Sequence, residues 1–133
     1  RILLLNDADG KFTLPAINTT ADSAVAGPGS DPNNLNNIGA SFYFYIETAA
    51  TDLDIKTDGT DKFTVAVMLA VDDGAKKAFV PAAANDVITF DGGTAGGLAG
   101  SVVQVTAVDD NNYLVHNSLV IATGTIVTPF ADA

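Results

Sequence analysis

The stretch from Asp86 to Ala133 decides the fold of this chain. It reads DVITF (86–90), GGTAGGLAGS (92–101), VVQVTAV (102–108), DDNN (109–112), YLV (113–115) and SLVIATGTIVTPFA (118–131). Apolar and β-branched runs separated by glycine or by Asp and Asn turns predict short strands with tight connections. So few charges remain that we expect this stretch to be buried against the rest of the protein or against another chain.

Similar patterns occur earlier in the chain. SFYFYIE (41–47) carries aromatic residues on both faces and predicts a central strand, while LDIKT (53–57) alternates apolar and polar residues. KFTVAVMLAV (62–71) could be read as a helix, but its alternation and the DDG that follows favour a strand. Near the start, ILLL (2–5) and FTL (12–14) predict two strands that the turn-forming residues between them would join as a hairpin.

The composition is that of an all-β protein. Of the 16 acidic residues only Glu47 is a glutamate, and the other 15 are aspartates, which prefer turns to helices. The 133 residues suit one domain. The prediction is a single-domain antiparallel β-sandwich or β-barrel, jelly-roll-like or β-tulip-like, with an extended N-terminal arm. Residues 1–40 are expected to form this arm and a long loop packed on the domain or on a neighbour, and residues 41–133 the β-domain.

Charge and hydropathy point to protein partners. Hydrophobic residues make up 47% of the chain and mean hydropathy is +0.27, although the net charge is −10. This combination suggests apolar surface reserved for partners, with acidic charge keeping the free protein in solution. Six basic residues are too few for a nucleic-acid-binding face. The apolar run at residues 2–5 is too short for a secretion signal or a membrane span, so we predict a strand or an apolar arm there.

No residue cluster predicts a reaction centre. His116 is the only histidine and cysteine is absent, so one chain cannot assemble a histidine-based triad or a thiolate metal site. NDADG (6–10) resembles the start of a calcium loop, but an EF-hand beginning at Asp7 would need glutamate where Asn18 stands. A turn is favoured there. Further aspartates are expected at turns that flank the strands, with a calcium ion shared between loops as the alternative: Asp58, Asp61, Asp72, Asp73, Asp109 and Asp110. We therefore predict no enzyme activity, no cofactor and no metal.

Two further motifs have a structural interpretation. The glycine-rich loop at 92–100 leads into a strand and lacks the lysine of a phosphate-binding loop, so it suits a close approach of backbones. In the aromatic run Phe42–Tyr45, successive side chains alternate between faces, so two should lie in the core and two should face solvent or a partner. Packing is favoured here over a platform for stacking sugars.

The C-terminal part of the chain resembles small structural proteins of tailed bacteriophages. The resemblance covers residues 57–133 and is carried by TDGTDKF (57–63), FVPAA (79–83), GSV (100–102) through TA (106–107), YLV (113–115), and the tail from Gly124 to Ala131. Phage segments of this kind often have Gly-Asp-Ser-Val before the strand and Trp after the turn. Here the Asp is missing, and Tyr113 stands in place of the Trp.

The resemblance implies a capsid decoration (cement) protein on the outer capsid surface of the virion. Its partners would be the major capsid protein and itself, as a homotrimer at three-fold or quasi-three-fold positions, with no nucleic acid and no membrane. The candidates for docking on the capsid are Arg1, Ile2, Leu3, Leu4 and Leu5. The candidates for the subunit interface are Gly96, Gly97, Leu98, Pro129 and Phe130. A trimeric head-fibre, tail-fibre or receptor-binding domain is the first alternative, and a carbohydrate-binding β-sandwich module is the second.

Overall fold

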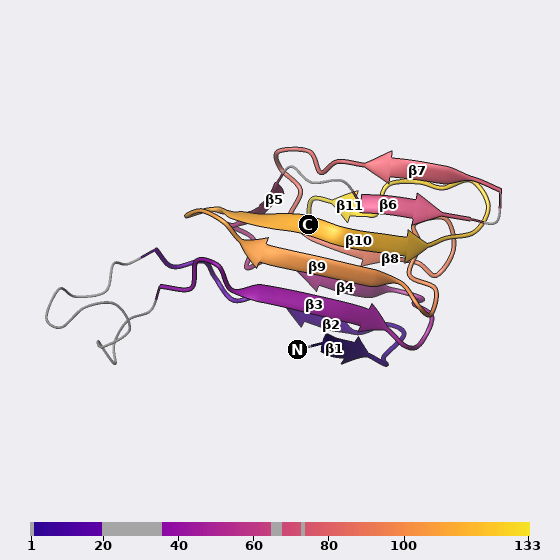
Figure 1. Cartoon of the computed structure of the whole chain (residues 1–133), viewed down its shortest axis with the longest axis horizontal. Helices are drawn as coiled ribbons and strands as arrows, with labels where there is room; N and C mark the ends of the chain where they lie inside the picture. The colour runs from indigo at the N-terminus through magenta and orange to yellow at the C-terminus, as the bar shows by residue number, and fades with distance from the viewer. Residues whose placement is uncertain (1, 20–35, 65–67, 73) are drawn as a thin grey trace, which may run out of the picture.

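A computed structural model describes residues 2–19, 36–64, 68–72 and 74–133 of the chain. These residues form eleven strands and no helix, arranged as two sheets packed face to face (Figure 1). The predicted all-β, single-domain sandwich is confirmed. Most of the long loop of the predicted N-terminal arm, residues 20–35, lies outside the described residues.

The two sheets differ in size. Sheet A has seven strands in the order β1-β3-β9-β10-β6-β7, with β5 also paired to β10, and sheet B has four strands in the order β11-β8-β4-β2. In Figure 1, sheet A lies towards the viewer and sheet B behind it. The strands are β1 (Ile2–Leu5), β2 (Lys11–Thr13), β3 (Ser41–Ile46), β4 (Leu53–Lys56), β5 (Lys62–Thr64), β6 (Met68–Val71), β7 (Lys76–Phe79), β8 (Val87–Phe90), β9 (Val102–Ala107), β10 (Asn112–Ile121) and β11 (Phe130–Ala131).

Both sheets are mixed, which corrects the expectation of antiparallel sheets. Strand β1 pairs in parallel with β3, β2 with β4, and both β5 and β6 with β10. The first four strands alternate between the sheets: β1 and β3 belong to sheet A, and β2 and β4 to sheet B. The chain therefore runs from β1 to its neighbour β3 through β2, and from β2 to its neighbour β4 through β3. Parallel pairing requires such a crossover. The predicted hairpin of residues 2–5 and 12–14 is therefore wrong, because its two strands belong to different sheets.

The core lies between the sheets and follows the alternation of each strand. In β3 the side chains of Phe42, Phe44 and Ile46 point inward, whereas Tyr43 and Tyr45 point outward. This confirms the predicted two-and-two division of the aromatic run. The strand itself is covered on one face only, whereas the sequence predicted that both of its faces would be covered. The rings of Phe12 and Phe44 meet edge to face with centroids 4.9 Å apart, which joins sheet B to sheet A.

Strand β10 unites two predicted strands. The sequence predicted separate strands for YLV (113–115) and for the apolar run that begins at Ser118, but one strand runs from Asn112 to Ile121. Its register against β9 shifts between His116 and Leu119, and Asn117 adopts a φ of +46°. Asparagine tolerates this conformation better than most residues, so the chain bulges there and continues. The predicted strand 62–71 contains two strands, β5 and β6, with residues 65–67 outside the described part of the chain.

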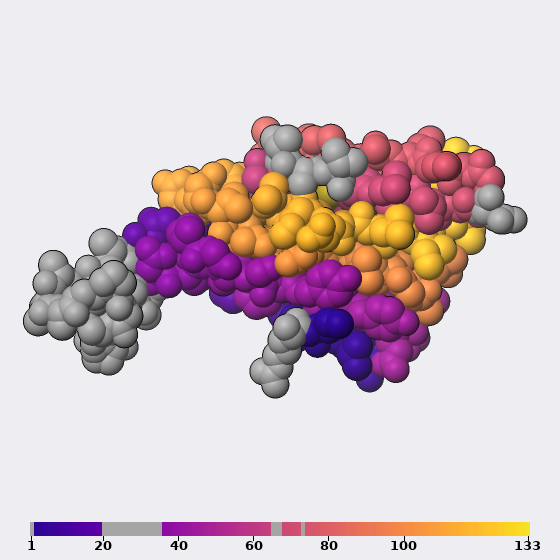
Figure 2. Space-filling view, viewed as in Figure 1, coloured from indigo at the N-terminus to yellow at the C-terminus, as the bar shows by residue number. Residues whose placement is uncertain are grey.

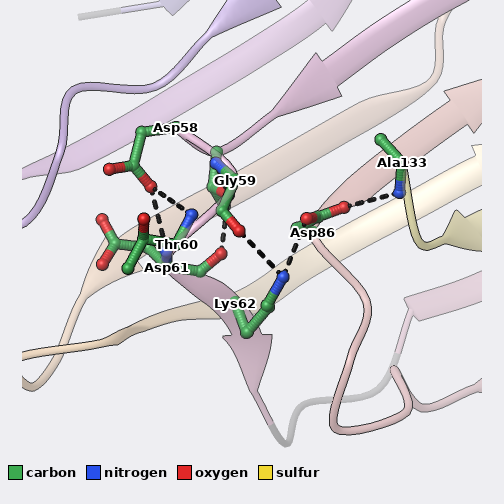
Figure 3. A network of polar contacts seen from close by, with 8 residues as sticks. Asp58, Gly59, Thr60, Asp61, Lys62, Asp86 and Ala133 are labelled. Carbon is green, nitrogen blue, oxygen red and sulfur yellow. Dashed lines mark hydrogen bonds and ion pairs between the residues drawn. The ribbon is translucent and has the colours of Figure 1, made fainter.

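A partly buried ion pair links the two sheets where β5 and β8 begin (Figure 3). Lys62 Nζ lies 2.8 Å from Asp86 Oδ2 and also donates to the Gly59 carbonyl, while the backbone N–H of Ala133 donates to Asp86 Oδ1. Burial alone would raise the pKa of Asp86, but the hydrogen bonds from Lys62 and Ala133 bring this pKa below its ordinary value. The pair therefore fixes the C-terminal residues against both sheets.

Candidate interaction surface

Among the described residues, the seven strands of sheet A carry no carboxylate, and the exposed Glu47 directly follows the end of β3. The chain as a whole has a net charge of −10. The cations of these strands are Lys62, which pairs with Asp86, and Lys76 and Lys77 in the outermost strand β7. Figure 2 shows this face, with β7 along its upper edge and β1 along its lower edge. This side of an acidic protein is thus almost uncharged.

Apolar side chains cross this face in one continuous row. The strand registers place Leu4 beside Tyr45, Tyr45 beside Val102, Val102 beside Leu119, and Leu119 beside Leu69. We call these five residues the apolar row. Leu4 is 62% exposed, Tyr45 37%, Leu119 43% and Leu69 38%. Single exposed apolar residues are ordinary on proteins, but a contiguous row over five strands is typical of an interaction surface.

The outer face of sheet B provides the contrast. Its outward side chains are mostly charged or polar, apart from Val87 and Ala131 at one end, and include Lys11, Thr13, Asp54, Lys56 and Thr89. Lys11 and Asp54 form an ion pair at 3.1 Å across β2 and β4. Polar residues on the outward positions of a strand are the normal pattern for a solvent-facing sheet. Sheet A departs from this pattern.

A cluster of uncharged polar side chains lies next to the apolar row. Gln104 Nε2 and Thr106 Oγ1 each donate to Ser41 Oγ at 2.9 Å, and Asn117 Nδ2 donates to Gln104 Oε1 at 2.9 Å. Thr106 Oγ1 and His116 Nε2 are hydrogen-bonded at 2.8 Å. Asn117 Nδ2 lies 3.4 Å from His116 Nδ1. The polar side chains of this face therefore bond mainly to one another.

Strand β1 supplies four of the five predicted docking residues. Ile2 and Leu4 point outward beside Tyr43 and Tyr45, and Ile2 is 58% exposed. Leu3 and Leu5 point inward and pack, half-buried, against the core. Arg1 lies outside the described residues. Strand β1 pairs with β3 along one edge, and no strand of the described chain pairs with its other edge.

Two open hollows lie along the side of the sandwich, between β1 and β2. One has a volume of about 190 Å³ and the other about 310 Å³, and Phe12 lines both. The lining of the first includes Asp7 and Lys11, and that of the second is Leu3, Phe12, Ser41 and Phe42. Neither hollow brings two carboxylates together, as the hydrolysis of a glycosidic bond would require.

The predicted subunit-interface residues are mostly buried in the chain's own fold. Gly96 and Gly97 have positive φ, and a Cβ on Gly97 would lie 2.4 Å from Phe90 Cβ. Pro129 and Phe130 are buried, and Leu98 is half-buried. The close backbone approach expected of the glycine-rich loop therefore has a cause within one chain. Contacts of these residues with a second subunit stay a prediction.

Some of the aspartates predicted at turns bond to local backbone, whereas Asp61 Oδ2 accepts the N–H of the distant Ile17 at 2.7 Å. Asp73 lies outside the described residues. Asp58 Oδ1 accepts the N–H groups of Thr60 and Asp61, as Figure 3 shows, and Asp109 Oδ1 accepts that of Asn111. Within the described residues no three His, Cys, Asp or Glu side chains are grouped as metal ligands. The same part of the chain contains no helix long and apolar enough to cross a membrane.

Reasoning from the sequence missed most of the apolar row. It singled out Leu4, but Tyr45 only as a member of the aromatic run, and it did not connect Leu69, Val102 and Leu119. The signal was present in part: β3, β6, β9 and β10 each have an apolar residue at an outward position, although other outward positions, such as Gln104 and Thr106, are polar. In comparisons with known proteins, no family model matched the sequence, and no curated protein or solved structure matched the chain.

Proposed function

We propose that this chain is a structural protein of a virion: a decoration protein that binds the outer surface of a tailed-phage head and stabilises the shell. One observation carries the proposal. The apolar edge strand β1 presents Ile2 and Leu4 to solvent at 58% and 62% exposure. The phage part of the proposal comes from the resemblance carried by residues 57–133. The part concerning protein binding comes from the surface itself.

The unpaired edge of β1 supports strand pairing with a shell subunit. Edge strands expose backbone N–H and C=O groups, and proteins usually protect them with charged residues or proline. Strand β1 is four consecutive aliphatic residues with neither. A strand of the shell subunit that pairs with β1 would extend sheet A and cover Ile2 and Leu4. In this proposal β1 docks on the shell by accepting a strand of the shell subunit at its free edge. Its pairing with β3 holds β1 in place for this contact.

Stabilisation of the shell follows from mass action. A protein that binds the assembled lattice, and not its separate subunits, shifts the equilibrium towards the lattice by RT ln(1 + [L]/Kd). At a free concentration of 100 times Kd, this amounts to about 2.7 kcal/mol per site. No chemical step is needed for this role.

Co-sedimentation with undecorated phage heads, assembled from the major capsid protein of the same genome, tests this function. Wild-type protein is expected to pellet with the heads and to raise their temperature of disruption. Leu4→Asp should abolish pelleting, because it places a carboxylate in the contact. Val127→Asp is the matched control: Val127 is also exposed, at 45%, but lies in the loop between β10 and β11. Wild-type protein that stays in the supernatant would refute shell binding.

A carbohydrate-binding module is the second candidate, and one observation favours it. Tyr43 and Tyr45 point from the same face of β3, as a platform for stacking sugars would require. Affinity electrophoresis in gels containing soluble polysaccharides tests this function. Retardation of the wild type that Tyr45→Ala removes would favour a carbohydrate-binding module, and migration unaffected by every polysaccharide would exclude it for those polymers.

A further inference from the structure

We infer that the outer face of sheet A is a self-association surface, which pairs face to face with the same surface of a second copy of this chain. The inference concerns strands β3, β9, β10 and β6, and it is independent of the shell binding proposed for the edge strand β1. The charge, the polar bonding and the apolar row of this face favour a second copy as the binding partner.

Charge selects a second copy over other partners. Two chains of net charge −10 repel each other wherever their carboxylates meet, so contact between them requires a face without carboxylates. Among the described strands of the molecule, those of sheet A have none, whereas β4 in sheet B carries Asp54. A basic partner would instead find its complement on the aspartate-bearing turns. The outer face of sheet A complements an uncharged surface, and the same face on another copy is one.

The polar side chains of this face can be covered at low cost. Burying a polar group is expensive when it loses its hydrogen bonds to water without replacement. Here Ser41, Gln104, Thr106, His116 and Asn117 already bond to one another at 2.8–3.4 Å. A second copy could therefore exclude water from this cluster without having to supply a matching set of donors and acceptors.

The apolar row supplies the attraction. Four of its five residues, Tyr45, Val102, Leu119 and Leu69, lie side by side across four strands. A two-fold axis through the face brings these four residues of one copy against the same four of the other. Two sheets packed in this way lie about 10 Å apart, with their side chains interdigitated. The resulting unit is a dimer with an isologous interface, which differs from the trimer implied by the phage resemblance.

Sedimentation velocity of the purified chain, from micromolar to millimolar concentration and at several NaCl concentrations, tests the inference. We expect a monomer–dimer equilibrium that shifts towards dimer as NaCl rises, because salt screens the repulsion between two acidic chains while leaving the apolar contact intact. The Debye length falls from about 10 Å at 0.1 M to about 3 Å at 1 M. A monomer under all conditions, a trimer, or association that weakens with salt would each overturn the inference.

Variants locate the contact. Leu119→Asp and Leu69→Asp are each expected to raise the dimer dissociation constant roughly 30-fold or more, because each dimer would bury two added carboxylates. Val127→Asp adds the same charge outside sheet A and should leave the dissociation constant nearly unchanged. Circular dichroism and thermal unfolding of each variant establish that the monomer is folded. A wild-type dimer that neither sheet A variant weakens would show that the copies meet elsewhere.

The two proposals fail separately. If heads bind the wild type and Leu119→Asp equally, while the free protein never dimerises, then shell binding stands and face-to-face pairing is wrong. If the salt-strengthened dimer forms and depends on Leu119 and Leu69, but heads are never bound, then pairing stands and the decoration function is wrong.

Discussion

Leu119 of β10 lies directly beside Leu69 of β6 in a parallel register, and both side chains are exposed, at 43% and 38%. Their strand neighbours Val120 and Ala70 are paired in the same register but are completely buried. Both faces of this strand pair are thus apolar, although only one of them faces the core. That arrangement is typical of a sheet with a second covering layer, and the described chain supplies only one layer.

Neighbouring residues of β3 should differ sharply in their contribution to stability. Phe44 is fully buried against Phe12, whereas Tyr45 lies on the outer face. Phe44→Ala is expected to lower the free energy of unfolding by about 3–5 kcal/mol. Tyr45→Ala should cost roughly 1 kcal/mol or less in the monomer. Urea unfolding of both variants at low protein concentration gives the comparison, and equal losses would contradict the strand's assigned orientation.

The glycine-rich loop should tolerate no side chain at Gly97. Its φ is +92°, and an added Cβ would lie 2.4 Å from Phe90 Cβ. Gly97→Ala therefore combines backbone strain with overpacking and should cost about 3 kcal/mol or more. Gly59→Ala is the control: its φ is +95° but nothing lies within 4 Å of the added Cβ, so strain alone should cost about 1–2 kcal/mol. Thermal unfolding that ranks the two variants in reverse would contradict the loop's packing.

Asp86 should make stability depend on pH in the acid range. Its pKa is below the ordinary value in the folded protein, so its stabilising effect is present above the unfolded-state pKa of about 3.9 and is lost as pH falls through the folded pKa. Asp86→Asn is expected to cost about 2 kcal/mol at pH 7, because it removes the charge that Lys62 meets at 2.8 Å.

The free energy of unfolding, measured between pH 7 and pH 2, checks this prediction. The variant should lose less stability over this range than the wild type. Asp52→Asn, at an exposed aspartate, is expected to leave stability at pH 7 within about 0.5 kcal/mol. Parallel pH profiles for the wild type and Asp86→Asn would show that the ion pair does not contribute as argued.

Tyr113 should titrate far above an ordinary tyrosine. Burial, followed by the charges of Asp61 and Asp58, raises its pKa to about 12, and its hydroxyl donates to the Pro15 carbonyl at 2.7 Å. Because the folded-state pKa is raised, the neutral phenol stabilises the fold below about pH 10, and this stability is lost as pH rises from about 10 to 12.

Absorbance at 295 nm during alkaline titration measures this ionisation directly. The chain has three tyrosines, and Tyr113→Phe should remove the component near pH 12 and cost about 1 kcal/mol at neutral pH. A titration curve whose high-pH component survives in Tyr113→Phe would assign that component to another tyrosine.

The sequence predicted individual strands better than their partners. Strand β3 begins at the predicted residue, Ser41, and the Asp109–Asn112 turn joins β9 to β10 as an antiparallel pair. These features depend on alternation and turn residues, which are local properties. The parallel pairing of β1 with β3 depends instead on the chain's passage through sheet B, and no local pattern encodes that path.

The interaction surface was predictable only in part. Leu4 stood out because four aliphatic residues in a row are conspicuous, whereas Leu119 and Leu69 belong to runs that look like ordinary buried strands. In such a run, the residues at alternate positions form two apolar sets, one on each face of the strand. The packing of the second sheet determines which set faces the core. Sheet B covers only one face of sheet A, so the other set remains exposed, and that is a tertiary property.

Hydroxyl-radical footprinting of side chains, in dilute and in concentrated wild-type protein at high salt, tests most directly the claim that the outer face of sheet A is a protein-contact surface. Tyr45, Leu69 and Leu119 should become less reactive on concentration, while exposed Val127 stays as reactive as in the monomer. Unchanged reactivity of those three residues, or protection confined to Val127, would contradict the claim.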